Sequence, residues 1–124
     1  MSYSFNPINK FPLSADNWRK AKNLFNGFTI LNAETGEEVV ACTVYLTGSY
    51  FRSIVKISHQ KTRWHLGAGI SKTYGGAVQA AFNNAGATLC KDLPFHYLSD
   101  CAEEAFHFAQ NVFGIKCYLV KFEA

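Results

Sequence analysis

The side chains that could perform catalysis or bind a metal are spread along the chain without a spacing that makes a site. None of the four histidines pairs with another His or with a Cys at a zinc-like spacing. The nearest approach to a cluster is Cys90, His96 and Cys101, whose unequal spacing gives a weak metal signal. The carboxylates gather at Glu37-Glu38 and Glu103-Glu104, in an expected turn and helix cap, and do not suggest an acid–base pair.

We therefore expect a protein that is not an enzyme and that uses neither a metal nor a cofactor. No Gly-x-Ser-x-Gly nucleophile motif is present, and Gly69-Ile70-Ser71-Lys72 lacks the spacing of a phosphate loop. An alternative is an enzyme with a Cys or His centre around Cys90, His96 and Cys101. An unusually reactive thiol in that segment would indicate it.

Charge is segregated along the chain. The formal net charge is +3, and no Asp or Glu lies between Val39 and Lys91. A positive surface in this middle segment favours an acidic partner, either protein or nucleic acid, although a solvated strand face would explain the same residues. The basic residues of the segment are Arg52, Lys56, Lys61, Arg63, Lys72 and Lys91.

Alternating side chains place several of these residues on one face of a predicted sheet. In the strand expected at 50–59, basic residues take one side and mainly apolar residues the other. In the strand expected at 62–66, Trp64 and Leu66 are predicted to point inward. The candidate face for binding a partner or nucleic acid then comprises Tyr45, Arg52, Lys56, Arg63 and His65.

A glycine-rich stretch joins the last strand of this sheet to a predicted central helix. Its free backbone N–H groups are expected to point at whatever lies above the turn, which favours an anion or a negatively charged partner, and Lys72 and Tyr74 extend the candidate site. The competing interpretation is a tight connection that lets a helix with a small-residue face pack on the sheet. The glycines assigned to this turn are Gly67, Gly69, Gly75 and Gly76.

The remaining elements predict one α+β domain, residues 14–124, after an N-terminal arm, residues 1–13. We expect an antiparallel sheet of about four to five strands with two to three helices packed on one face, in the order αβββ(β)ααβ. The last strand is apolar on both sides and is expected inside the sheet or covered on both faces. Helices are predicted at 14–27, after the glycine stretch and before Gly114, and strands at 28–32, 38–46, 50–59, 62–66 and 115–122.

Composition and cysteine use bear on the location of the protein. Hydrophobic residues make up 48% of the 124 positions, which is ample for one core, yet no run approaches the ~18 apolar residues of a membrane helix. The four cysteines form no Cys-x-x-Cys pair and no signal-like segment begins the chain, so we expect reduced thiols and a cytoplasmic protein. The aromatic arm and the apolar last strand suggest a homodimer.

The segment Gly67-Ala68-Gly69-Ile70-Ser71-Lys72, followed by a helix with Ala80-Ala81, resembles the end of a double-stranded-RNA-binding domain. In that family a three-stranded sheet leads through Gly-x-Gly-x-Ser-Lys into a helix whose first lysines grip phosphates. The resemblance covers about 20 residues and implies binding of RNA or DNA by the basic sheet face and the glycine turn. Of the family's lysines Lys72 is present, while Thr73 and Gly76 occupy the positions of others.

The outline of the whole chain resembles small proteins of phages, prophages and plasmids. A strand meander, a glycine-rich turn with Lys72, an alanine-rich helix ending Ala85-Gly86, and a last strand after Gly114 carry this resemblance. It implies a non-enzymatic inhibitor of host defence, of the anti-CRISPR or anti-restriction kind, that occupies a surface of a host protein or nucleoprotein. The alternative function is direct nucleic-acid binding in the manner of the double-stranded-RNA-binding domain.

Overall fold

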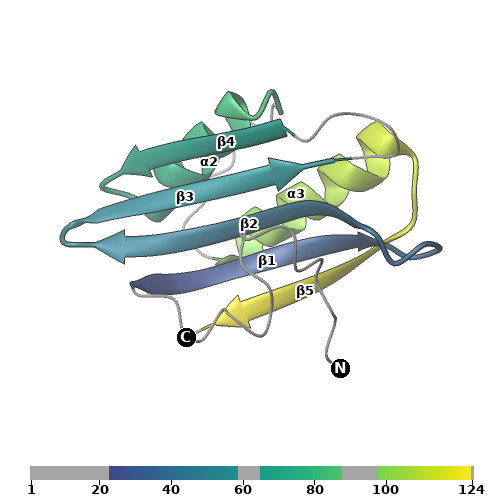
Figure 1. The fold of residues 1–124 in the computed structure, drawn as a ribbon, viewed down its shortest axis with the longest axis horizontal. Coiled ribbons are helices and arrows are strands. Elements are labelled where there is room, and N and C mark those ends of the chain that lie inside the picture. Colours follow the sequence, from purple (N-terminus) through teal and green to yellow (C-terminus); the bar gives the residue numbers. More distant parts are fainter. Residues whose placement is uncertain (1–22, 59–64, 88–97, 124) are drawn as a thin grey trace.

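The computed structural model describes residues 23–58, 65–87 and 98–123 (Figure 1). The predicted arm at 1–13, most of the helix predicted at 14–27, and Arg63 lie outside these residues. The described part contains one five-stranded antiparallel sheet and two helices, which confirms the predicted α+β class. The elements are β1 (Leu24–Asn32), β2 (Glu38–Thr47), β3 (Tyr50–Ile57), β4 (His65–Ser71), α2 (Tyr74–Asn84), α3 (Leu98–Phe113) and β5 (Cys117–Glu123).

The strands follow the order β4-β3-β2-β1-β5, so the first four form a meander and β5 joins beside β1. Both helices cover the same side of the sheet, with α2 behind β3 and β4 and α3 behind β1, β2 and β5 (Figure 1). We call this side the helix face and the other side the opposite face. Neither described helix is long and apolar enough to span a membrane.

The core lies between the helix face and the two helices. Phe28 and Val55 project from the sheet, and Phe82 and Ala105 meet them from α2 and α3; all four are at most 1% exposed. Alternation along each strand sends every second side chain into this layer, which is why the predicted apolar face of β3 lies inside.

The helix predicted at 14–27 is wrong over its last residues, because Leu24–Gly27 belong to β1. The helical spacing of Leu24 and Phe25 gave the false signal. β1 pairs with β2 on one side and with β5 on the other, and hydrogen bonding along both edges outweighs a weak local preference for helix.

The last strand also differs from its prediction. β5 lies at an edge of the sheet, paired with β1 alone, and Tyr118 on the opposite face is exposed. α3 covers the helix face of β5, where Leu119 and Cys117 pack against the core. Apolar residues on both sides of a strand therefore do not require burial on both sides.

Two irregularities in the β1–β2 pairing redirect side chains. Phe25 is the extra residue between the pairs Leu24–Tyr45 and Asn26–Val44, so Phe25 and Asn26 both turn toward α2. Val39 is the extra residue at the other end, where Val39 and Val40 both join the core. The second irregularity turns Glu38 to the opposite face, where it meets Thr29.

Candidate binding surface

The glycines of the expected turn have a different role. Gly67 and Gly69 lie within β4, and Gly75 and Gly76 lie in the first turn of α2, so the prediction of a glycine turn is wrong. A β-carbon on Gly67 would come within 3.0 Å of backbone atoms of Ala81 and Ala85. Gly69 faces α2 equally closely. The glycines thus allow a helix to pack directly on a strand, as the competing interpretation expects.

This packing fixes which way β4 faces. Because Gly67 and Gly69 take the helix face, Leu66, Ala68 and Ile70 stand on the opposite face. Leu66 is 59% exposed and Ile70 is 66% exposed. The expected inward position of Leu66 is therefore wrong. His65 is exposed, as expected, but it pairs with Ile57 and so lies on the helix face, away from Arg52.

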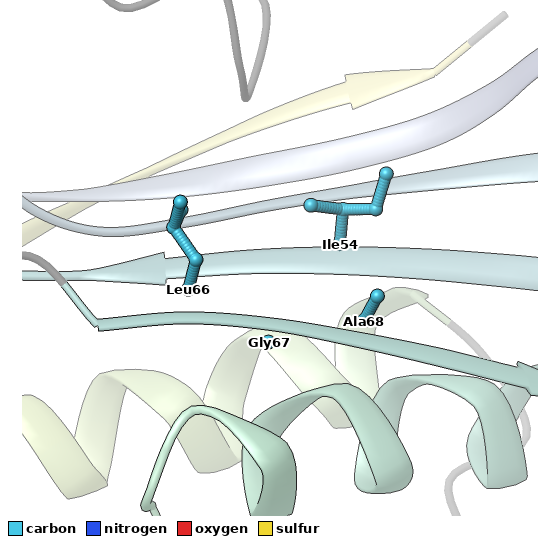
Figure 2. A pocket seen from close by; sticks show the side chains of 4 residues that line it. All are labelled: Ile54, Leu66, Gly67 and Ala68. Atoms are coloured by element: carbon cyan, nitrogen blue, oxygen red, sulfur yellow. The ribbon is translucent and has the colours of Figure 1, made fainter.

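A shallow hollow of about 270 Å³ lies beside these side chains on the opposite face. It is lined by Ile54 of β3 and by Leu66, Gly67 and Ala68 of β4. Figure 2 shows the side chains of Ile54, Leu66 and Ala68 on the side of the sheet away from the helices. We call the apolar area formed by Ile54, Leu66, Ala68 and Ile70 the β4 surface.

Two exposed cations flank one end of the β4 surface. Arg52 is paired with Ile70 across β3 and β4, and its guanidinium carbon lies 5.2 Å from the centre of the Tyr45 ring. Lys72 follows the last residue of β4 and is exposed. Stacking on the Tyr45 ring holds the Arg52 side chain against the sheet, while the guanidinium group stays in contact with solvent. Tyr45 itself is 8% exposed.

Lys56 does not join these cations at the surface. It is 3% exposed, on the opposite face, and burial lowers its pKa while the nearby Glu38 opposes that shift. Burial likewise raises the pKa of Glu38, against a hydrogen bond from Thr29 Oγ1 to Glu38 Oε2 of 3.0 Å and the charge of Lys56. The predicted basic face is thus divided, because Arg52 is exposed and Lys56 is part of a buried polar group.

Tyr74 is also a core residue and does not belong to the surface. Its hydroxyl donates a hydrogen bond of 2.8 Å to Asn26 Oδ1, and its ring packs against Phe25 and Phe51. It is 7% exposed. The prediction that Tyr74 contacts a partner is therefore wrong in this structure, since the ring and hydroxyl are engaged inside the molecule.

The side chains of two residues that precede α2 accept backbone hydrogen bonds at its N-terminus. Thr73 Oγ1 accepts a hydrogen bond from the Gly76 N–H at 3.1 Å, and Ser71 Oγ accepts from the Thr73 N–H at 3.2 Å. Thr73 is therefore an N-cap that uses one of the amides that the anion-binding hypothesis required. Gly76 leaves room for these two hydroxyl side chains.

The cysteines in the described residues are free and buried. Cys42 Sγ lies 3.5 Å from Ser53 Oγ, and burial raises the pKa of the Cys42 thiol to about 12. Burial also raises the pKa of Cys101, so this thiol is not an activated nucleophile. Cys90 and His96 lie outside the described residues, and within those residues no three His, Cys, Asp or Glu side chains gather as metal ligands.

The exposure of Leu66 and Ile70 and the position of Glu38 near Lys56 were not predicted from the sequence. The signal for Leu66 and Ile70 was present, because glycines at alternate strand positions mark the close-packed side and send their neighbours to the other face. The contact of Glu38 with Thr29 had no such signal, since it depends on the bulge at Val39.

Comparison with known proteins gives no match of any of the three kinds: no family model matches the chain, and no curated protein or solved structure is significantly similar to it.

Proposed function

We propose that this chain is a non-enzymatic binding protein that acts by occupying a surface of its partner. The observation that carries the proposal is the β4 surface, where Leu66 and Ile70 are more than half exposed on one strand. A folded monomer gains nothing from exposing a row of apolar side chains along one strand, whereas such a row suits a binding surface. Arg52 and Lys72 beside this surface favour a partner that is acidic at one end.

The setting we propose is a phage or other mobile element, with a host defence protein or nucleoprotein as partner. The small size, the absence of Asp and Glu between Val39 and Lys91, and the outline resemblance support this setting. Arg52 and Lys72 would be repelled by a nucleic-acid-binding site, which is itself basic, so the contact we propose lies on an acidic area beside such a site.

The proposal is tested by capture from lysate of a candidate host, with nuclease added. Tagged wild type is compared with Ile70→Glu and with Val112→Glu, which changes an exposed apolar residue of α3. We expect a captured protein that is lost with Ile70→Glu and kept with Val112→Glu. Capture that survives Ile70→Glu, or that depends on intact nucleic acid, would contradict the proposal.

A second candidate is direct binding of RNA or DNA. It is supported by Lys72, exposed at the start of α2 directly after a Gly-x-Gly strand, and by Arg52 at the same end of the sheet. The burial of Lys56 and the position of His65 leave fewer phosphate contacts than the sequence suggests. Phosphate contacts supply most of such affinity, so this function requires cations beyond these two.

The assay for the second candidate is a mobility shift at low salt with duplex and single-stranded RNA and DNA. A double variant, Arg52→Gln with Lys72→Gln, should weaken any shift by the loss of two phosphate contacts and reduce its salt dependence. A wild-type protein that shifts none of these nucleic acids would remove the candidate.

A further inference from the structure

The backbone N–H and C=O groups of successive residues in β4 point alternately toward β3 and toward the outer edge of the sheet. The hydrogen bonds between β2 and β3 determine which residues of β4 point outward. The Ser58 N–H donates to Val39 O at 2.9 Å, which makes these two residues a hydrogen-bonded pair of β2 and β3. Bonded and non-bonded pairs alternate along an antiparallel ladder, so Ile54 also bonds to β2. Ala68, opposite Ile54, therefore directs its N–H and C=O away from β3.

A second observation agrees with this orientation of Ala68. Asn84 Nδ2 of α2 donates a hydrogen bond of 2.6 Å to Ala68 O, which is accessible to α2 only if that carbonyl faces the outer edge. The same alternation places the backbone N–H and C=O groups of Leu66 and Ile70 at that edge. The residues with outward backbone groups are thus the residues whose side chains form the β4 surface.

Within its own seven residues, β4 has none of the charged residues, prolines or bulges that protect edge strands. β4 pairs with β3 over seven consecutive residues without a bulge, and it contains no Pro, Lys, Arg, Asp or Glu. β5, the other edge, carries Lys121 and Glu123. In the described part of the chain, Asn84 supplies the one side-chain donor that reaches the outer edge of β4.

We propose that an acidic, extended segment of a partner protein adds to β4 as a sixth strand. This inference rests on the proposed function and names its binding mode. Residues of the added strand opposite Leu66, Ala68 and Ile70 would place their side chains on the β4 surface, so apolar residues fit there at alternate positions. A carboxylate beyond the Ile70 end would lie beside Lys72 and Arg52.

The probe is a synthetic peptide that reads the same in both directions, acetyl-Asp-Glu-Val-Thr-Val-Thr-Val-Glu-Asp-amide, so that either strand direction presents the same side chains to the β4 surface. Binding to the full chain is followed by fluorescence titration and by backbone amide NMR. We expect shifts at the amides of Leu66, Ala68 and Ile70. Replacing the acidic residues by lysines should weaken binding about tenfold or more, since like charges then meet at Lys72.

Two methylated forms of the same peptide separate strand addition from docking of side chains alone. In antiparallel addition, methyl groups on the three valine nitrogens remove the donors that face β4 and should weaken binding about tenfold or more. Methyl groups on the two threonine nitrogens, which face away in that arrangement, should leave affinity nearly unchanged. In parallel addition the two effects are exchanged. Ile70→Thr should weaken binding of the parent peptide, and Val112→Thr on α3 should not.

Three results would overturn the inference. Equal binding of both methylated peptides would show docking through side chains without strand addition, and the proposed function would still stand. Absence of binding by the acidic peptide would exclude an acidic strand as occupant. Shifts of the β4 amides that grow with protein concentration without peptide would assign the edge to a second copy of this chain.

Discussion

At the scale of single residues, Tyr74 illustrates how a polar aromatic residue can resemble a binding residue and serve the core. Its hydroxyl and the Asn26 side chain satisfy each other across 48 positions of sequence. This pair exists because the bulge at Phe25 turns Asn26 toward α2. The hydrogen bond therefore links the first strand to the central helix.

We expect Tyr74→Phe to lower the free energy of unfolding by about 1–3 kcal/mol, because the buried Asn26 oxygen loses its donor. Urea unfolding measures the change. Tyr50→Phe, which alters an exposed tyrosine, should stay within about 0.5 kcal/mol of wild type. If Tyr74→Phe instead abolished partner binding at unchanged stability, the placement of this residue in the core would be contradicted.

The half-buried Glu38, which lies beside the buried residues Thr29 and Lys56, should make stability depend on pH. The folded state raises the pKa of Glu38 above its usual value of 4.5, so over the interval from 4.5 to the raised value the folded state binds more protons than the unfolded state. The stability of wild type relative to Glu38→Gln should then fall as pH rises through that interval and be highest below it.

Urea unfolding of both proteins between about pH 4 and 7 checks this expectation. Glu34→Gln makes the same change of charge at an exposed turn position and serves as the control for net charge. A difference between wild type and Glu38→Gln that does not vary with pH would show that the Glu38 carboxylate is hydrated in the folded protein.

At the scale of elements, the contact of β4 with α2 determines where the apolar side chains go. Gly67 and Gly69 have no side chain to separate strand from helix, so the helix backbone lies directly against them. As a consequence, β4 contributes no side chain to the core at Gly67 and Gly69. The gain is a close strand–helix pair that holds Leu66 and Ile70 in a fixed, outward orientation.

Gly67→Ala should destabilise the protein by about 1–3 kcal/mol or more, because its methyl group would collide with helix backbone that cannot rotate away. Ala68→Ser, on the exposed side of the same strand, is the matched control and should change stability by less than about 0.5 kcal/mol. The measurement is the free energy of unfolding in urea of both variants and of wild type. Full stability of Gly67→Ala would mean that α2 lies further from β4.

At the scale of the whole molecule, one core joins the sheet to both helices. Phe82 of α2 and Ala105 of α3 belong to the same buried cluster as Phe28 and Val55. Charge is arranged along the length of the sheet, with Glu34, Glu37 and Glu38 at the β1–β2 end and Arg52 with Lys72 at the other. The molecule is therefore one cohesive unit with an uneven distribution of charge.

Phe82→Ala should destabilise this unit by about 3–5 kcal/mol, since a fully buried ring leaves a cavity between α2 and the sheet. Unfolding of the variant should remain one transition, in which the helical circular dichroism signal and the protection of sheet amides from hydrogen exchange are lost together. The measurement is thermal unfolding followed by both signals. Separate loss of α2 before the sheet would contradict a single shared core.

Local patterns in the chain determined most of the element list. Alternation predicted β2 and β3, and helical spacing followed by Gly86 and Gly114, each with positive φ, predicted where α2 and α3 end. These features depend on neighbours a few residues apart, so the sequence alone expresses them. The absence of acids from Val39 to Lys91 is equally a property of the sequence.

Tertiary structure alone decided which residues reach the surface. Pairing of β1 with two strands overrode its helical spacing, the bulge at Val39 turned Glu38 toward Thr29, and the approach of α2 to Gly67 sent Leu66 outward. Each outcome depends on contacts between segments far apart in the chain. A side chain's exposure is set by what packs against its strand. The alternate glycines of β4 indicate a close-packed side, but only the tertiary structure shows that α2 lies against it.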